Sequence, residues 1–124
     1  MSGMSPVMLA VLTAFGGIAS ADEPANNPAP GDAEVARQGG VLFNVMNCDG
    51  CHGAGGLGFV GPSLVDGRWR FGGDDAVIFQ SIRDGRPHGM PAYGRLLSDP
   101  VIWQLVTYLQ SQPLPKDVPT LAWP

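Results

Sequence analysis

The sequence is poor in charged residues and contains very little cysteine or lysine. Its 124 residues include two cysteines and seven basic residues, of which Lys116 is the one lysine. Two cysteines are too few for the disulfide-dense scaffold of a small secreted domain. Eleven acidic residues bring the net charge to −4, so the chain lacks the basic patch that a nucleic-acid partner requires. The scarcity of lysine also excludes a polybasic membrane-binding segment.

Long apolar runs are also missing, since none reaches the roughly 18 residues that a membrane-spanning helix needs. Residues 7–19 form a shorter apolar block, followed by the small-x-small pattern Ala19-Ser20-Ala21 and then by the first acidic residues. This pattern predicts a secretory signal peptide over residues 1–21, an exported, periplasmic protein, and no membrane span after cleavage. The segment before the block has no Lys or Arg, which leaves an uncleaved anchor as the alternative.

The rest of the chain divides by composition. Residues 22–31 read DEPANNPAPG and predict a flexible, proline-rich linker. Residues 32–112 form the expected folded domain, and residues 113–124 an irregular proline-rich tail. A domain of this length is close to the size at which side chains alone can supply a core. We therefore expect something else to help fill its interior.

Apolar periodicity predicts an all-α domain with no convincing strand. A first helix begins at Asp32, with the apolar positions Val35, Leu42, Val45 and Met46, and residues 50–73 follow as a glycine-rich loop without secondary structure. A second helix begins at Asp74 or Asp75 and stops at Gly85. The last helix starts near Ser98 and is ended by Pro113; Trp103 and Tyr108 are placed on the flanks of its apolar stripe.

The chemistry of the chain is expected at Cys48-Asp49-Gly50-Cys51-His52. This is the C-x-x-C-H pattern of c-type haem attachment. Thiols at i and i+3 lie on one side of a helical turn, where they can reach both vinyl groups of one porphyrin, and the adjacent imidazole can bind the iron. Three alternatives are a thioredoxin-like redox pair, half of a zinc site with His52 and His88, and a structural disulfide. The adjacent histidine and the export signal favour one covalent haem c.

If His52 is one axial ligand, a second is needed, and methionine or histidine serves in haem cytochromes. Met46 is too close to Cys48 along the chain to reach the opposite face of the haem. Met90 lies in the loop Gly89-Met90-Pro91, which is a poor place for a core-filling side chain. Met90 is the favoured ligand, and His88 is the rival.

These motifs resemble class I, mono-haem cytochromes c. The resemblance rests on Gly40 and Phe43, the haem motif, Gly61-Pro62-Ser63-Leu64, Gly89-Met90-Pro91 and the Trp103/Tyr108 helix. It implies about three to five short helices around the haem, with the Pro62 carbonyl orienting His52. It also implies that the terminal helices cross with Gly39 or Gly40 against Leu105 and Tyr108.

A finer resemblance concerns the partners. The runs 69–74, 78–79 and 85–94 are similar to small periplasmic cytochromes that accept electrons from PQQ-dependent (quinoprotein) alcohol dehydrogenases and pass them towards a terminal oxidase. The resemblance implies a monomeric electron-transfer protein, not an enzyme, that works with redox proteins. The alternatives are a haem subunit held permanently in a dehydrogenase or oxidase complex, and a haem enzyme or sensor with an open sixth site.

Other residues of the haem pocket can be proposed from the sequence. Trp69 and Arg70 carry donors that can bond a haem propionate. Apolar contacts to the haem are expected from Phe59, Leu64, Phe71, Ile78 and Leu97. Three arginines near Met90 form either a docking rim for an acidic partner or an ordinary solvated face: Arg83, Arg86 and Arg95.

Overall fold

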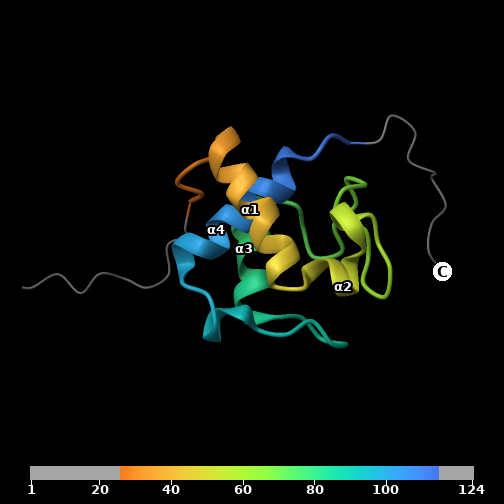
Figure 1. The fold of residues 1–124 in the computed structure, drawn as a ribbon. Coiled ribbons are helices and arrows are strands. Elements are labelled where there is room, and N and C mark those ends of the chain that lie inside the picture. Colours follow the sequence, from red (N-terminus) through yellow and green to blue (C-terminus); the bar gives the residue numbers. More distant parts are fainter. Residues whose placement is uncertain (1–25, 115–124) are drawn as a thin grey trace, which may run out of the picture.

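The computed structural model describes residues 26–114, in which helices are joined by loops and no strand is formed (Figure 1). The predicted signal peptide, the start of the predicted linker and nearly all of the predicted tail lie outside the described residues. The all-α prediction is confirmed. The elements, in chain order, are α1 Ala33–Val45, α2 Cys48–His52, η1 Ala54–Gly56, α3 Asp75–Asp84, η2 Tyr93–Arg95 and α4 Asp99–Ser111.

The three longer helices begin and end close to where the sequence predicts. The Asp32 side chain caps α1 by accepting a hydrogen bond from the Val35 N–H at 2.9 Å. Helix α3 stops at Gly85, and α4 has Ser98 as its N-cap residue with Pro100 in its first turn. No helix among residues 26–114 is long and apolar enough to cross a membrane.

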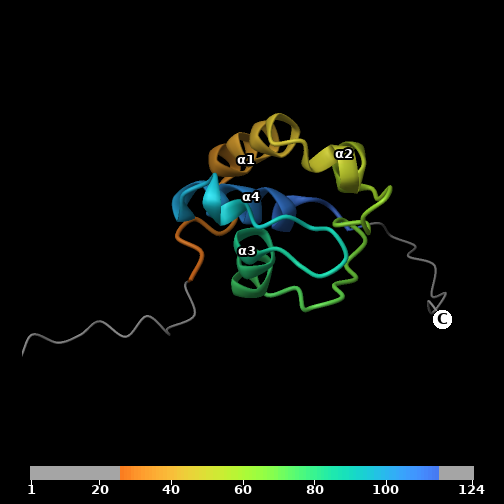
Figure 2. The ribbon, with the colours of Figure 1, turned by 90° about the horizontal axis from the view of Figure 1, so that it is seen from below.

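Helix α4 forms the centre of the core, because it packs against both α1 and α3. Figure 2 shows α4 between these two helices. Trp103 was expected on a flank of α4, but it is buried and stacks on Phe79 of α3 with the ring centres 4.2 Å apart. The flank prediction fails because α4 is covered on two sides. The main cluster of buried side chains is Phe43, Ile78, Phe79, Ile82, Ile102, Trp103, Leu105, Val106 and Leu109.

The crossing of α1 over α4 depends on Gly39. A Cβ atom added at Gly39 would strike the backbone carbonyl of Gln104 and would lie 2.7 Å from Tyr108 Cβ. Only glycine permits this approach of two helix backbones. The predicted contact with Tyr108 is therefore present. The backbone of Gln104 lies closer still to this position, and Leu105 is buried in the core.

Three local predictions from the sequence are wrong or incomplete. Val45 ends α1 and is 73% exposed, so it does not belong to the apolar face. The 50–73 segment is not structureless throughout, since it contains the end of α2 and all of η1. Asn27, placed in the flexible linker, hydrogen-bonds to Asp75 Oδ2 at 2.7 Å and to Thr107 Oγ1 at 3.1 Å, so the packed region begins before Asp32.

Candidate haem-binding site

One cavity of about 870 Å³ collects the residues that the sequence singled out. Its walls come from α2, the 60–72 segment, α3, the 86–91 loop and α4. This volume lies within the range of cofactor and ligand sites in proteins, about 300–1,000 Å³. Every predicted cofactor-binding residue lines it: Cys48, Cys51, His52, Pro62, Leu64, Trp69, Arg70 and Met90.

The two cysteines lie one turn apart on α2, on the wall of the cavity. They do not form a disulfide; Cys48 is half-buried and Cys51 is exposed. Burial, together with the nearby Asp49 carboxylate, raises the pKa of the Cys48 thiol to about 11. The helix thus presents two thiols side by side to an apolar space, as attachment to one porphyrin requires.

The alternative chemistries have little support in this geometry. Among residues 26–114, no group of three or more His, Cys, Asp or Glu side chains is placed to hold a metal ion, so a zinc site lacks its ligands. The described part of the chain also has no βαβ unit around the cysteines, as a thioredoxin-like pair would need.

The imidazole of His52 is held by the loop that follows α2. Its Nδ1 atom lies 2.8 Å from the carbonyl oxygen of Pro62, which can only accept a hydrogen bond, so Nδ1 carries the proton. The Gly61 N–H donates to the Cys51 carbonyl at 2.7 Å. A Cβ at Gly61 would lie 2.9 Å from two atoms of the His52 ring. The loop therefore fixes the tautomer of His52 and leaves Nε2 free for a metal.

The 86–90 loop forms a second wall, and it presents Met90 and His88 differently. The Arg86 N–H donates to the Met90 carbonyl at 3.1 Å, which closes the loop. His88 is exposed and has a φ of 73°. Met90 is half-buried and packs against the hydrophobic core. Met46, the other methionine in the described chain, does not line the cavity. The loop thus places the thioether of Met90 at a packed position in the wall.

The apolar part of the wall is partly as expected. Leu64, Phe71 and Ile78 line the cavity. Phe59 and Leu97 do not, and the expectation for these two is wrong: Phe59 is 77% exposed at the tip of its loop, and Leu97 packs against the hydrophobic core.

Sequence reasoning missed several further lining side chains, among them Ile82, Tyr93, Leu105 and Leu109. Ile82 follows Ile78 by four residues on α3, and Leu109 follows Leu105 by four on α4. This i, i+4 spacing was the available signal, since it puts both members of a pair on one helix face.

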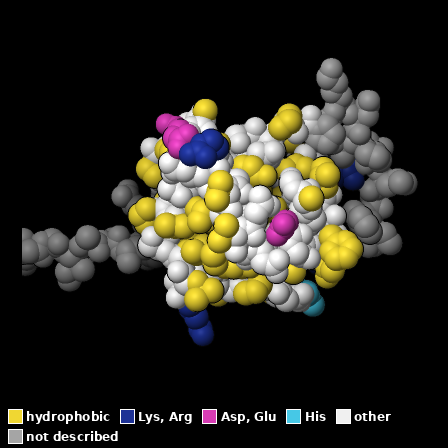
Figure 3. All heavy atoms as spheres, viewed as in Figure 1, with side chains coloured by type: hydrophobic (Ala, Val, Ile, Leu, Met, Phe, Trp, Pro, Cys, Tyr) yellow, Lys and Arg dark blue, Asp and Glu magenta, His cyan; other side chains and the backbone are white. Residues whose placement is uncertain are grey.

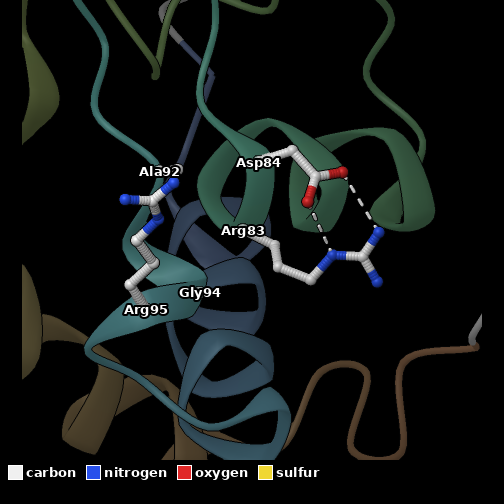
Figure 4. Close-up of a pocket in the computed structure, with 5 residues that line it drawn as sticks. All are labelled: Arg83, Asp84, Ala92, Gly94 and Arg95. Carbon is white, nitrogen blue, oxygen red and sulfur yellow. Dashed lines mark hydrogen bonds and ion pairs between the residues drawn. The ribbon is translucent and has the colours of Figure 1, made fainter.

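The three arginines near Met90 have separate surroundings. Arg83 pairs with the Asp84 carboxylate at 2.9 Å, and Figure 4 shows its guanidinium turned towards that group. With Arg95, it borders a second cavity of about 390 Å³, away from the cysteines. Arg86 instead lines the large cavity. Neither a common docking rim nor an ordinary solvated face therefore describes Arg86, whose side chain is half-buried in the wall.

The surface over α1 and α2 is largely uncharged. Figure 3 shows hydrophobic side chains spread across this face with few acidic or basic groups among them. The exposed apolar residues of α1 and of the loop after α2 include Val41, Val45, Leu57, Phe59 and Val60. Exposed apolar groups beside a site suit contacts with another protein.

The residues present fit a covalently attached haem. Paired thiols, an imidazole with one free nitrogen and a thioether from another segment line one mostly apolar cavity. No other common cofactor requires this set of groups together.

Comparisons with known proteins agree with this fit. Residues 34–109 match the family described as cytochrome C oxidase, cbb3-type, subunit III. The chain is 38% identical over 112 residues to the cbb3-type cytochrome c oxidase subunit FixP of Azorhizobium caulinodans, covering 81% of this chain and 38% of that protein. It is 37% identical over 87 residues to subunit CcoP of Azospirillum brasilense, covering 64% of this chain and 29% of that protein. The chain thus matches less than half the length of either relative.

Solved structures show the same fold. Cytochrome cL of Methylophaga aminisulfidivorans superposes with a TM-score of 0.60 at 28% identity, covering 64% of this chain and 54% of that one. Cytochrome c6 of Phaeodactylum tricornutum gives a TM-score of 0.52 at 30% identity, covering 61% and 91%. The fold is that of a class I cytochrome c, and the protein carries covalently bound haem c. The chain belongs to the cytochrome c family described as cbb3-type cytochrome c oxidase subunit III.

Proposed function

We propose that this cytochrome c electron carrier delivers electrons, one at a time, to a terminal oxidase, using an iron held between His52 and Met90. The observation that carries the proposal is the meeting of α2 and the 86–90 loop at one cavity. Haem supplies the chemistry when bound, since its iron alternates between the ferrous and ferric states. The protein residues attach it, position its ligands and exclude water.

Cys48 and Cys51 attach the cofactor through thioether bonds, and His52 binds the iron. The supporting contact is the 2.8 Å hydrogen bond from His52 to the Pro62 carbonyl, which orients the ring and makes the free nitrogen a stronger donor. The Gly61 N–H in the same loop also donates to the Cys51 carbonyl of α2, so the position of the loop is coupled to that of the cysteines.

Met90 would supply the second iron ligand, in preference to His88. Met90 packs against the core from a loop closed by its own carbonyl, whereas His88 lies exposed at the tip. A thioether ligand in an apolar cavity disfavours the extra positive charge of ferric iron and raises the reduction potential. If His52 and Met90 both bind the iron, it would have no position open to a substrate, and electron transfer without catalysis is the expected role.

Trp69 and Arg70 bind the haem propionates, while Leu64 packs on the ring. Both Trp69 and Arg70 line the cavity, and Arg70 is exposed. An exposed guanidinium at the edge of an apolar cavity can bond a carboxylate that remains partly in water.

The names of the curated relatives favour a haem domain held in an oxidase complex over a free acceptor for a quinoprotein alcohol dehydrogenase. We place the domain in the periplasm. The largely uncharged face over α1 and α2 would contact its partner in that complex.

Two substitutions test the ligand assignment. Met90→Ala should turn ferric haem high-spin, lower the reduction potential and admit cyanide rapidly. His88→Ala is the matched control and should leave all three unchanged. A high-spin spectrum from His88→Ala with a normal spectrum from Met90→Ala would reverse the assignment.

The oxidase assignment needs a separate experiment. The reduced protein should be oxidised rapidly by membranes that contain a cbb3-type oxidase, and slowly by membranes from which that oxidase has been deleted. Equal rates with both membranes would contradict the proposed acceptor.

A further inference from the structure

Arg86 differs from the other arginines near Met90, because its side chain is fixed in the wall of the large cavity. Its Nε–H donates to Ser81 Oγ at 2.9 Å, and its guanidinium carbon lies 4.3 Å from the centre of the Phe71 ring. Its backbone N–H donates to the Met90 carbonyl at 3.1 Å. The residue is half-buried. These contacts hold the guanidinium against Ser81 and Phe71.

The contacts of Arg86 join three separate segments of the wall. Ser81 belongs to α3, Phe71 to the segment before α3, and Met90 to the loop after it. The Ser81 hydroxyl donates its proton to the Val77 carbonyl at 2.8 Å, so its oxygen is an acceptor for Arg86. A cation over the face of Phe71 is held by the electron-rich ring. The side chain thus connects the loop to helix α3 and to the segment before α3.

The loop needs such a connection because its own backbone does not favour the closed shape. His88 adopts a φ of 73°, a conformation that residues with a Cβ rarely populate. The loop also contains Gly89, and glycine is the residue with the most conformational freedom to lose. Among residues 26–114, the backbone hydrogen bond that closes the loop is the single one from the Arg86 N–H to the Met90 carbonyl.

We propose that Arg86 is a positioning residue that keeps the 86–90 loop closed and thereby holds Met90 on the iron. The side chain ties the start of the loop to Ser81 and Phe71, and the backbone ties it to the Met90 carbonyl. This inference rests on the proposed ligation by Met90. It makes Ser81 and Phe71 part of the same device, because both hold the Arg86 side chain.

The test is the rate at which cyanide binds the ferric holoprotein, since cyanide enters only when Met90 leaves the iron. Arg86→Lys keeps the charge but loses the Nε donor and the flat guanidinium, and Ser81→Ala removes the acceptor. Each should speed cyanide binding on the order of tenfold, as expected for losing a hydrogen bond to a charged group. Arg95→Lys, the matched control at an exposed arginine of η2, should bind cyanide within about twofold of the parent rate, as for a surface change.

Because Arg86 acts through Ser81, the effects of the two substitutions on the rate of cyanide binding should not add. The double variant Arg86→Lys/Ser81→Ala should bind cyanide no faster than the faster single variant, because both remove the same contact. The visible absorption band of methionine-ligated ferric haem should weaken in parallel. If Arg86→Lys does not assemble with haem, Ser81→Ala supplies the same measurement, since it leaves the guanidinium in place.

The outcomes separate this inference from the ligand assignment. Parent-like cyanide rates in both Arg86→Lys and Ser81→Ala, with fast binding to Met90→Ala, would overturn the role of Arg86 and leave the ligation standing. A parent-like rate and spectrum in Met90→Ala would show that Met90 is not the ligand, and both proposals would fall.

Discussion

Replacing Gly39 by alanine should destabilise the protein, although alanine is the better helix former. In an isolated helix, Gly→Ala gains about 1 kcal/mol. Here the added Cβ would collide with the Gln104 carbonyl and lie 2.7 Å from Tyr108 Cβ. Neither atom can rotate away, because one is backbone and the other is attached directly to it. Helix α1 must therefore move off α4.

The size of the expected loss in the free energy of unfolding follows from overpacking. Inserting a methyl group into a packed interior costs about 1–3 kcal/mol, and the rigidity of both neighbours places Gly39→Ala at or above the top of that range. After subtracting the propensity gain, we expect a net loss of about 2 kcal/mol. For a domain of this size, such a loss lowers the melting temperature by about 8–16 °C.

Gly40→Ala is the matched control, one residue further along the same helix. Its Cβ would meet the edge of the Tyr108 ring at 3.1 and 3.2 Å, and a ring can shift by a few tenths of an ångström. The propensity gain should then offset the crowding, and stability should stay within about 0.5 kcal/mol of the parent. Thermal and guanidinium unfolding of the holoproteins measure both changes. A Gly39→Ala protein as stable as the Gly40→Ala protein would refute the close helix crossing.

Three further predictions address the cofactor, its proximal ligand and acid stability. The double variant Cys48→Ala/Cys51→Ala, expressed without haem attachment, should show no cooperative melt, because the 870 Å³ cavity leaves the small core incomplete; a native-like melt would contradict this. Gly61→Ala should push the His52 ring away from the Pro62 carbonyl and so make the imidazole a weaker donor to the iron. A redox titration should then show a higher reduction potential, whereas the control Gly40→Ala should leave the potential unchanged. Hydrogen bonds from Arg37 and then Gln38 lower the pKa of Glu34 from 4.5 to about 2, so the stabilisation is present above pH 4.5 and is lost as the pH falls towards 2. Glu34→Gln should therefore be less stable than the parent near neutral pH and equal to it near pH 2 in urea unfolding; a difference that persists in acid would exclude this cause.

Helix positions and the haem motif could be predicted because they depend on local patterns. Three of these features are set by residues a few positions apart: the capping by Asp32, the stop at Gly85 and the placement of Cys48 and Cys51 one turn apart. The burial of Trp103 could not be read in this way, since it depends on a second helix that covers its side of α4.

Arg86 shows the same limit at the site itself. Its position near Met90 in the sequence suggested a docking role, as for Arg83 and Arg95. Its partners, Ser81 and Phe71, are brought to it by the packing of α3 against the loops. The sequence therefore predicted that Arg86 lies near Met90, but not the direction in which its side chain points.

The central claim is one covalent haem with His52 and Met90 as its axial ligands, and an optical redox titration of the holoprotein tests it most directly. The protein should keep its haem under denaturing acid extraction, remain low-spin in both oxidation states, and follow a one-electron Nernst curve. High-spin ferric haem, or haem that is released by the extraction, would contradict the account.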